Sequence, residues 1–200
     1  YPTKVSKTEY ARPLGVISGI DARYDAGLAA LGRPKAAIPF PDEWGFLAQA
    51  VWTVAEARGE VRRFPAEREY LNHIVRVRHN HRLFVIEKSR RMYVTWLFCA
   101  LYLYDTMTQP HHANFIASRK LESSCELLGR CYQIYESIPA DVWPHKPEIV
   151  THAGYSGKGY RRLECGSSSL EAVAEGKDQL RQYTASNILL DEFAFWQKAE

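Results

Sequence analysis

The chain has 200 residues, and its hydrophobic fraction of 46% is enough to fill the core of one domain and argues against wholesale disorder. The formal net charge of +3 permits contact with nucleic acid without indicating it. Four cysteines without a C-x-x-C spacing favour reduced thiols of an intracellular protein, and no histidine spacing matches a zinc site.

The first sixty residues predict an N-terminal arm followed by a helix. Residues 1–41 carry Gly, Pro and scattered charge with weak periodicity, which is typical of a loosely organised segment. The stretch "PDEWGFLAQAVWTVAEARGE" then repeats apolar residues at near-helical spacing, and Asp42 or Glu43 suits its N-terminus. We therefore expect an arm and helix over residues 1–60 and a second domain over residues 61–200.

Alternating elements follow in the second domain. "FPAEREYLNHIVRVRHN" predicts a helix that begins at Pro65, and "RLFVIEKS" predicts a short buried strand. "VTWLFCALYLYDTM" is apolar on every side, so we expect a central helix; it is too short to span a bilayer. "HHANFIAS" predicts the next strand.

The last third of the chain continues this pattern. Ser118 is predicted to cap the helix "RKLESSCELLGRCYQIYESI". "YRRLECGS" predicts a strand, the Gly- and Ser-containing stretch after it a loop, and "SNILLDEFAFW" a final strand. The order predicts an α/β domain with a mainly parallel sheet flanked by helices, whose ligands bind beyond the carboxyl ends of the strands.

Two acids follow the final apolar strand. Ile188, Leu189 and Leu190 run directly into Asp191 and Glu192. In phosphate-transfer ATPases this is the Walker B arrangement, in which the first acid holds Mg²⁺ and the second polarises the attacking water. Alternatively, the strand ends at the surface with two solvated acids.

The segment "EKSRRMYVT" lies between a predicted strand and a predicted helix, where a phosphate loop would be found. Thr95 matches the last position of G-x-x-x-x-G-K-[ST], but Tyr93 takes the second glycine, Val94 the lysine and Lys88 the first position. Backbone N–H groups at a helix N-terminus attract anions whatever the side chains, and Lys88 adds charge. The alternative is an ordinary turn with a solvated basic patch.

Three stretches in this order, "FVIEKSRRMYVTW", "FIASRKLESSCELLGR" and "NILLDEFAFW", resemble the ATPase domain of the large terminase subunit of tailed bacteriophages. That family often carries a deviant phosphate loop, K-S-R-x-x-G-x-[ST]-W, with the lysine moved to its start. "KSRRMYVTW" matches this form except at Tyr93, where the family carries glycine. The resemblance covers roughly Pro65 to Trp196 and implies a P-loop NTPase fold over residues 61–200.

The resemblance implies a role for each candidate residue. Glu192 would be the catalytic base, Arg90 or Arg91 would stabilise transition-state charge, and Thr95 with Asp191 would hold Mg²⁺. Arg181 is a weaker candidate for phosphate sensing, and the region around Phe64 and Pro65 would contact adenine. The residues that would bind the nucleotide are Lys88, Ser89, Arg90, Arg91, Met92, Tyr93, Val94 and Thr95.

The family hydrolyses ATP to drive double-stranded DNA into an empty capsid in the host cytoplasm. By resemblance, we expect ATP and Mg²⁺ as cofactors. The expected partners are DNA, the portal protein, the small terminase subunit and copies of the same chain in a ring, usually a pentamer, with no membrane. The chain stops soon after the Walker B stretch, so we expect a fragment without nuclease activity. The alternatives are another P-loop DNA translocase and a catalytically silent nucleotide-binding or scaffold protein.

Overall fold

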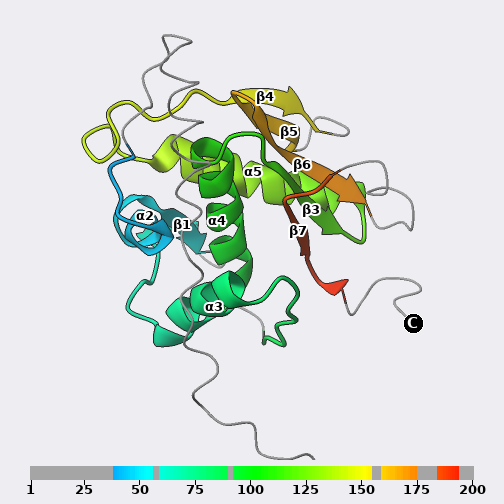
Figure 1. The fold of residues 1–200 in the computed structure, drawn as a ribbon, viewed down its shortest axis with the longest axis horizontal. Coiled ribbons are helices and arrows are strands. Elements are labelled where there is room, and N and C mark those ends of the chain that lie inside the picture. The colour runs from blue at the N-terminus through cyan, green and yellow to red at the C-terminus, as the bar shows by residue number, and fades with distance from the viewer. Residues whose placement is uncertain (1–37, 56–58, 90–91, 155–158, 175–183, 194–200) are drawn as a thin grey trace, which may run out of the picture. The chain divides into compact units, whose positions relative to one another are not determined.

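The computed structural model describes residues 38–55, 59–89, 92–154, 159–174 and 184–193 (Figure 1). The chain divides into two units, residues 1–37 and residues 38–200, and residues 1–37 of the predicted N-terminal arm lie outside the described residues. The helices and strands are α2 (Glu43–Ala50), β1 (Trp52–Ala55), β2 (Glu60–Arg63), α3 (Glu69–Asn80), α4 (Val94–Thr108), β3 (Ala113–Ser118), α5 (Leu121–Ser137), β4 (Val150–Ala153), β5 (Tyr160–Cys165), β6 (Ser168–Ala174) and β7 (Asn187–Leu190).

The main sheet has five strands in the order β4-β5-β6-β3-β7. Strand β3 pairs in parallel with β6 on one side and with β7 on the other. Strands β4, β5 and β6 are joined as antiparallel neighbours, and the two-residue turn between β5 and β6 uses Gly166 at φ 59°. The fold is therefore α/β with a mixed sheet, and the expectation of a mainly parallel sheet is corrected at the β4–β5–β6 end.

Strand β6 was not expected from the sequence. The stretch after "YRRLECGS" was predicted to be a loop because of its Gly and Ser residues, and that prediction is wrong. The serines stand at the start of β6, where Ser168 Oγ donates a hydrogen bond to the Gln109 carbonyl at 2.5 Å. The side chains of Leu170 and Ala172 then enter the core. Tertiary pairing with β3 and β5 overrides the turn-like composition.

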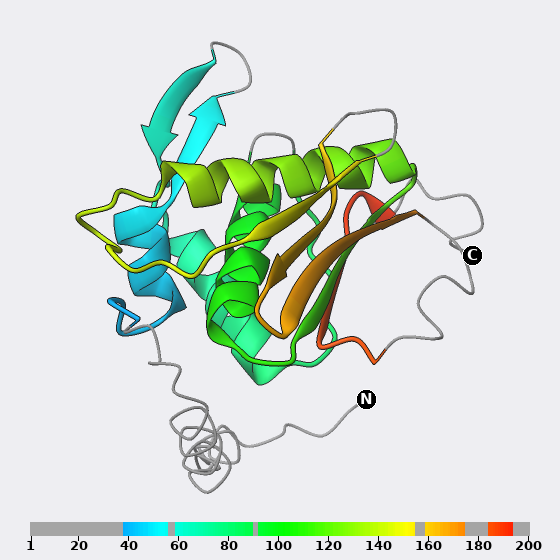
Figure 2. The same ribbon diagram turned by 90° about the horizontal axis from the view of Figure 1, so that it is seen from above.

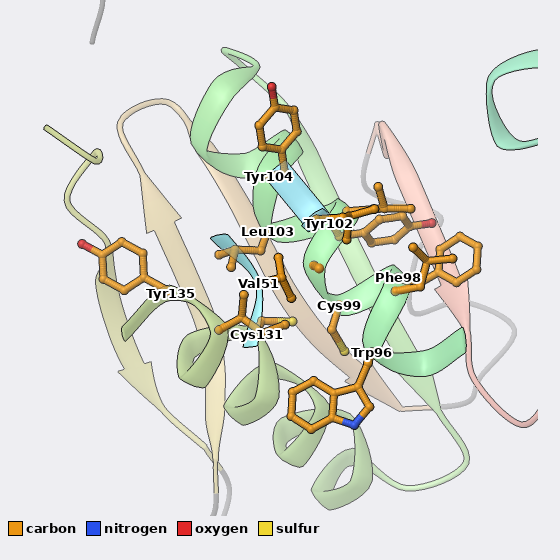
Figure 3. Packing of buried hydrophobic residues seen from close by; sticks show 14 of the residues in the cluster. Val51, Trp96, Phe98, Cys99, Tyr102, Leu103, Tyr104, Cys131 and Tyr135 are labelled. Carbon is orange, nitrogen blue, oxygen red and sulfur yellow. The ribbon is translucent and has the colours of Figure 1, made fainter. Parts of the chain in front are cut away.

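Helices α4 and α5 pack against one face of the sheet and against each other (Figure 2). Both helices are confirmed, as is β3. Helix α4 is buried from Val94 to Met107 apart from the half-buried Thr95, and Figure 3 shows Cys99 and Leu103 of α4 near Cys131 of α5. Ile116 of β3 joins this core, whereas Phe115 of β3 belongs to a smaller cluster on the opposite face. The long apolar run is therefore the centre of the domain.

The segment around α2 differs in part from its prediction. Helix α2 begins as expected, with Asp42 Oδ1 accepting a hydrogen bond from the Gly45 N–H at 2.7 Å. It ends at Ala50, and the remainder forms the β1–β2 hairpin, so the prediction of one long helix is wrong. The β-branched residues Val51, Thr53 and Val54 favour extended backbone. Side chains of α2 lie in the same core as α4.

Three further local predictions are corrected. Helix α3 begins at Glu69 rather than at Pro65. Helix α5 has Lys120 as its N-cap residue, and Ser118 is the last residue of β3 rather than a cap. Residues 82–89 form no strand, although their side chains alternate: Phe84 packs against Phe98 with ring centroids 5.9 Å apart, while Val85 is 92% exposed.

Candidate functional site

The N-terminus of α4 and the carboxyl end of β7 meet, although they lie far apart in the sequence. The Thr95 hydroxyl, in the first turn of α4, donates a hydrogen bond to Asp191 Oδ1 at 3.2 Å. The Asp191 N–H extends the pairing of β7 with β3 through a 2.9 Å hydrogen bond to the Ala117 carbonyl. Both side chains are half-buried. The helix and the strand therefore bring a hydroxyl and a carboxylate, which are oxygen groups of the kind that Mg²⁺ prefers, together at the end of the sheet.

Tyr93 has a left-handed backbone conformation, which glycine adopts more readily than other residues. It is the N-cap residue of α4 with φ 56° and ψ 3°, in the left-handed region. Among the described residues other than glycine, only His111 and Glu192 share a positive φ. Side-chain contacts disfavour this conformation in most residues, and the family form has glycine at this position. Tyr93 therefore has a backbone conformation that glycine would adopt without strain.

Arg68 and Tyr70, at the start of α3, contact the two residues that precede Val94 of α4. The Tyr70 hydroxyl donates a hydrogen bond to the Met92 carbonyl at 2.9 Å. The Arg68 guanidinium lies over the Tyr93 ring, 5.1 Å from its centroid, and its Nη1 is 3.5 Å from the Tyr70 hydroxyl. The sequence pattern carries no signal for this contact, because it joins segments 22 residues apart that have no common periodicity.

The other predicted residues are placed only in part. Lys88 and Ser89 are exposed, just before the loop, and Val94 is buried at the start of α4. Glu192 is exposed, directly follows Asp191 and has φ 53°. Arg90, Arg91 and Arg181 lie outside the described residues.

Phe64, the first residue of the region expected to contact adenine, is packed into the core. Phe64 is 3% exposed, and its ring meets Trp44 edge to face with centroids 6.4 Å apart. The adjacent Pro65 is half-buried. The Phe64 ring is therefore a core side chain, and the contact with adenine stays a prediction for its neighbours.

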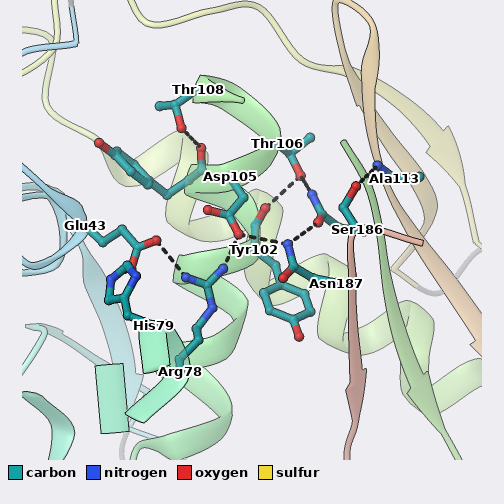
Figure 4. Close-up of polar contacts among 12 residues, drawn as sticks. Glu43, Arg78, His79, Tyr102, Asp105, Thr106, Thr108, Ala113, Ser186 and Asn187 are labelled. Carbon is teal, nitrogen blue, oxygen red and sulfur yellow. Dashed lines mark hydrogen bonds and ion pairs between the residues drawn. The ribbon is translucent and has the colours of Figure 1, made fainter. Parts of the chain in front are cut away.

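A buried polar network lies at the other ends of α4 and β7 (Figure 4). Arg78 of α3 pairs with Glu43 of α2 at 2.7 Å and with Asp105 of α4. Asn187, the first residue of β7, donates hydrogen bonds to Asp105 Oδ2 at 3.1 Å and to Asn114 Oδ1 at 2.8 Å. The network therefore joins two helices to α4 and, through Asn187 and Asn114, to two strands.

Two carboxylates share one guanidinium in this network. Burial raises the pKa of Asp105 from its ordinary value of 3.8 to about 6, despite the opposing attraction of Arg78. Burial also opposes the charge of Arg78, but Asp105 and Glu43 raise its pKa, so the guanidinium stays protonated. Because Asp105 lies about 15 Å along α4 from Thr95, the network fixes the far ends of the two elements that form the candidate site.

Neither a scan against protein-family models nor a search of curated proteins finds a match to the chain. Within the described ranges, no three or more His, Cys, Asp or Glu side chains are grouped to hold a metal ion. No helix in that part of the chain is both long and apolar enough to cross a membrane. The contact between Thr95, at the start of α4, and Asp191, at the end of β7, is therefore the feature that bears on function.

Proposed function

We propose that this chain is the ATP-hydrolysing motor domain of a terminase that moves double-stranded DNA into a viral procapsid. The observation that carries the proposal is the 3.2 Å contact between Thr95 Oγ1 and Asp191 Oδ1. The sequence motifs assign these two side chains to one Mg²⁺ ion, and the contact joins residues 96 positions apart. A P-loop NTPase fold is part of the proposal, supported by the parallel β6-β3-β7 strands beneath α4.

The two oxygens fit Mg²⁺ in their chemistry. Mg²⁺ prefers oxygen ligands and is commonly bound by one or two protein groups together with water and substrate phosphates. Thr95 offers a hydroxyl and Asp191 a carboxylate, both half-buried where the surrounding protein limits solvent. Bound there, Mg²⁺–ATP would supply the reactive phosphoryl group and the charge that neutralises its oxygens.

The N-terminus of α4 fits the phosphates. The first N–H groups of a helix have no partner within it and attract anions. Tyr93 makes no side-chain cap to α4, and the first turn carries no acidic residue. Lys88, exposed before the loop, is the side chain that we assign to the β- and γ-phosphates.

The remaining roles follow from the resemblance. Glu192, beside Asp191, would orient and deprotonate the attacking water. Arg90 or Arg91 would stabilise charge in the transition state, in the same subunit or in a neighbouring one of the ring. We propose the portal protein and the small terminase subunit as partners, and the host cytoplasm as the place of action.

Hydrolysis and binding measurements on paired variants test the proposal. Lys88→Ala should weaken the protection that Mg²⁺–ATP gives against thermal unfolding, whereas Arg76→Ala, on an exposed position of α3, should not. Glu192→Gln should keep that protection but lower kcat on the order of a hundredfold or more, while the exposed Glu126→Gln keeps full turnover.

The outcomes separate the alternatives. Equal turnover in Glu192→Gln would reject its role as base. The absence of any nucleotide-dependent shift at millimolar ATP would favour a silent scaffold protein. Hydrolysis stimulated by DNA alone would favour another translocase, whereas stimulation that requires portal or procapsid supports packaging.

A further inference from the structure

The conformation of Tyr93 requires support from its surroundings. A left-handed backbone is unfavourable for a residue with a Cβ atom, and it persists only where neighbouring contacts hold it. Tyr93 is the residue that begins α4, so its φ of 56° sets the direction in which the loop enters the helix. A second conformation of this residue would change the direction in which the chain enters α4.

The support comes from Arg68, the N-cap residue of α3, and from Tyr70 in its first turn. The Tyr70 hydroxyl fixes the Met92 carbonyl at 2.9 Å, immediately before Tyr93. The Arg68 guanidinium covers the Tyr93 ring at 5.1 Å from its centroid and stands 3.5 Å from the Tyr70 hydroxyl. The two contacts hold the backbone on one side of Tyr93 and its ring on the other.

We infer that Arg68 and Tyr70 are positioning residues that hold the phosphate loop in the conformation for which a glycine would otherwise be needed. They act through Met92 and Tyr93 and do not themselves touch the nucleotide. The inference rests on the proposed function for its effect on nucleotide binding, but the coupling of Tyr70 and Arg68 to Tyr93 is a property of the protein without ligand.

This role differs from ordinary packing in one measurable way. The Tyr70 hydroxyl bonds to the Met92 carbonyl and not to the Tyr93 ring, so if it only stabilised the fold it would contribute the same amount whether residue 93 is tyrosine or glycine. A side chain that holds Tyr93 in the left-handed region becomes dispensable in Tyr93→Gly, because glycine adopts positive φ without strain. If Tyr93→Gly abolishes the effect of replacing such a side chain, the role of that side chain is to hold Tyr93 in its left-handed conformation.

The test is a double-mutant cycle read out by nucleotide binding. Tyr70→Phe removes only the hydroxyl, and Arg68→Gln removes the charge over the ring. In the wild-type background, each should weaken the binding of a non-hydrolysable ATP analogue with Mg²⁺ about fivefold, the size expected for one hydrogen bond, and raise KM with little change in kcat. In the Tyr93→Gly background, each should change affinity by less than about twofold. Tyr132→Phe, on α5, serves as the matched control and should have no effect in either background.

The same variants, without nucleotide, separate this inference from the proposed function. Urea unfolding should show that Tyr70→Phe destabilises the wild-type background more than the Tyr93→Gly background. If no variant binds nucleotide, the proposed function fails, and this coupling in unfolding still decides the inference. Equal losses in both backgrounds, in binding where it is present or in unfolding where it is not, would overturn it.

Discussion

Tyr93 stands at a glycine position of the phosphate-loop motif and is also the N-cap residue of α4. The residue replaces a glycine of the family form, yet its φ of 56° is one that glycine adopts readily. Its ring lies under Arg68, and its neighbour Met92 is held by Tyr70. Tyr93 therefore differs from glycine in its side chain, while its backbone has a conformation that glycine adopts readily.

Replacing Tyr93 tests the conformation directly. Tyr93→Gly should be more stable to urea than Tyr93→Ala by about 1 kcal/mol, because alanine keeps the left-handed strain and glycine removes it. The order should reverse at the exposed Glu126 in α5, where alanine should be more stable than glycine by about 1 kcal/mol. A more stable alanine variant at both positions would contradict a left-handed Tyr93.

The individual elements could be predicted where local pattern and final environment agree. Helix α4 is apolar all round and buried all round, so its composition alone indicated its place. The predictions of individual elements were wrong where strand formation depends on pairing with a distant part of the chain. Residues 82–89 alternate as a strand does but make no ladder with the described residues, and β6 carries serines typical of a loop yet pairs on both sides. Local sequence does not specify which partner a segment finds.

The network that ties α3, α4 and β7 together should make stability depend on pH. The pKa of Asp105 is about 6 in the folded protein, against an ordinary 3.8, so the folded state keeps this proton to a higher pH than the unfolded state. As the pH rises from about 4 to about 6, the unfolded state is therefore favoured, and stability falls; above that range the contribution is constant.

Comparison with Asp105→Asn isolates this effect. Between pH 4 and pH 7, the free energy of unfolding of the wild type should fall by about 2 kcal/mol relative to the variant, given the shift from 3.8 to about 6. The exposed Asp141→Asn should follow the wild-type curve throughout. Parallel curves for the wild type and Asp105→Asn would show that the carboxyl group ionises normally. Urea unfolding across this pH range is the measurement.

The assembled domain brings distant motifs together at one end of its sheet. Strands β3 and β7 are parallel neighbours, and α4 lies against the same sheet, so Thr95 and Asp191 meet although each belongs to a different motif. The position of Asp191 was predictable, because it follows a strand that is parallel to β3, and the carboxyl ends of parallel strands share one edge. The strand predicted before Thr95 does not form, so the same reasoning does not account for the place of Thr95. The support from Arg68 and Tyr70 was not predictable either, because it depends on how α3 packs beside the loop and leaves no periodic pattern in the sequence.

We propose that Thr95 and Asp191 hold one metal ion for a bound nucleotide. Calorimetric titration with a non-hydrolysable ATP analogue, with and without Mg²⁺, tests it most directly in the wild type, Asp191→Asn and the exposed control Asp141→Asn. We predict binding that requires Mg²⁺ in the wild type and the control and that loses this requirement, together with at least about tenfold of its affinity, in Asp191→Asn. No binding at millimolar analogue, or identical Mg²⁺-dependent binding in Asp191→Asn, would contradict the claim.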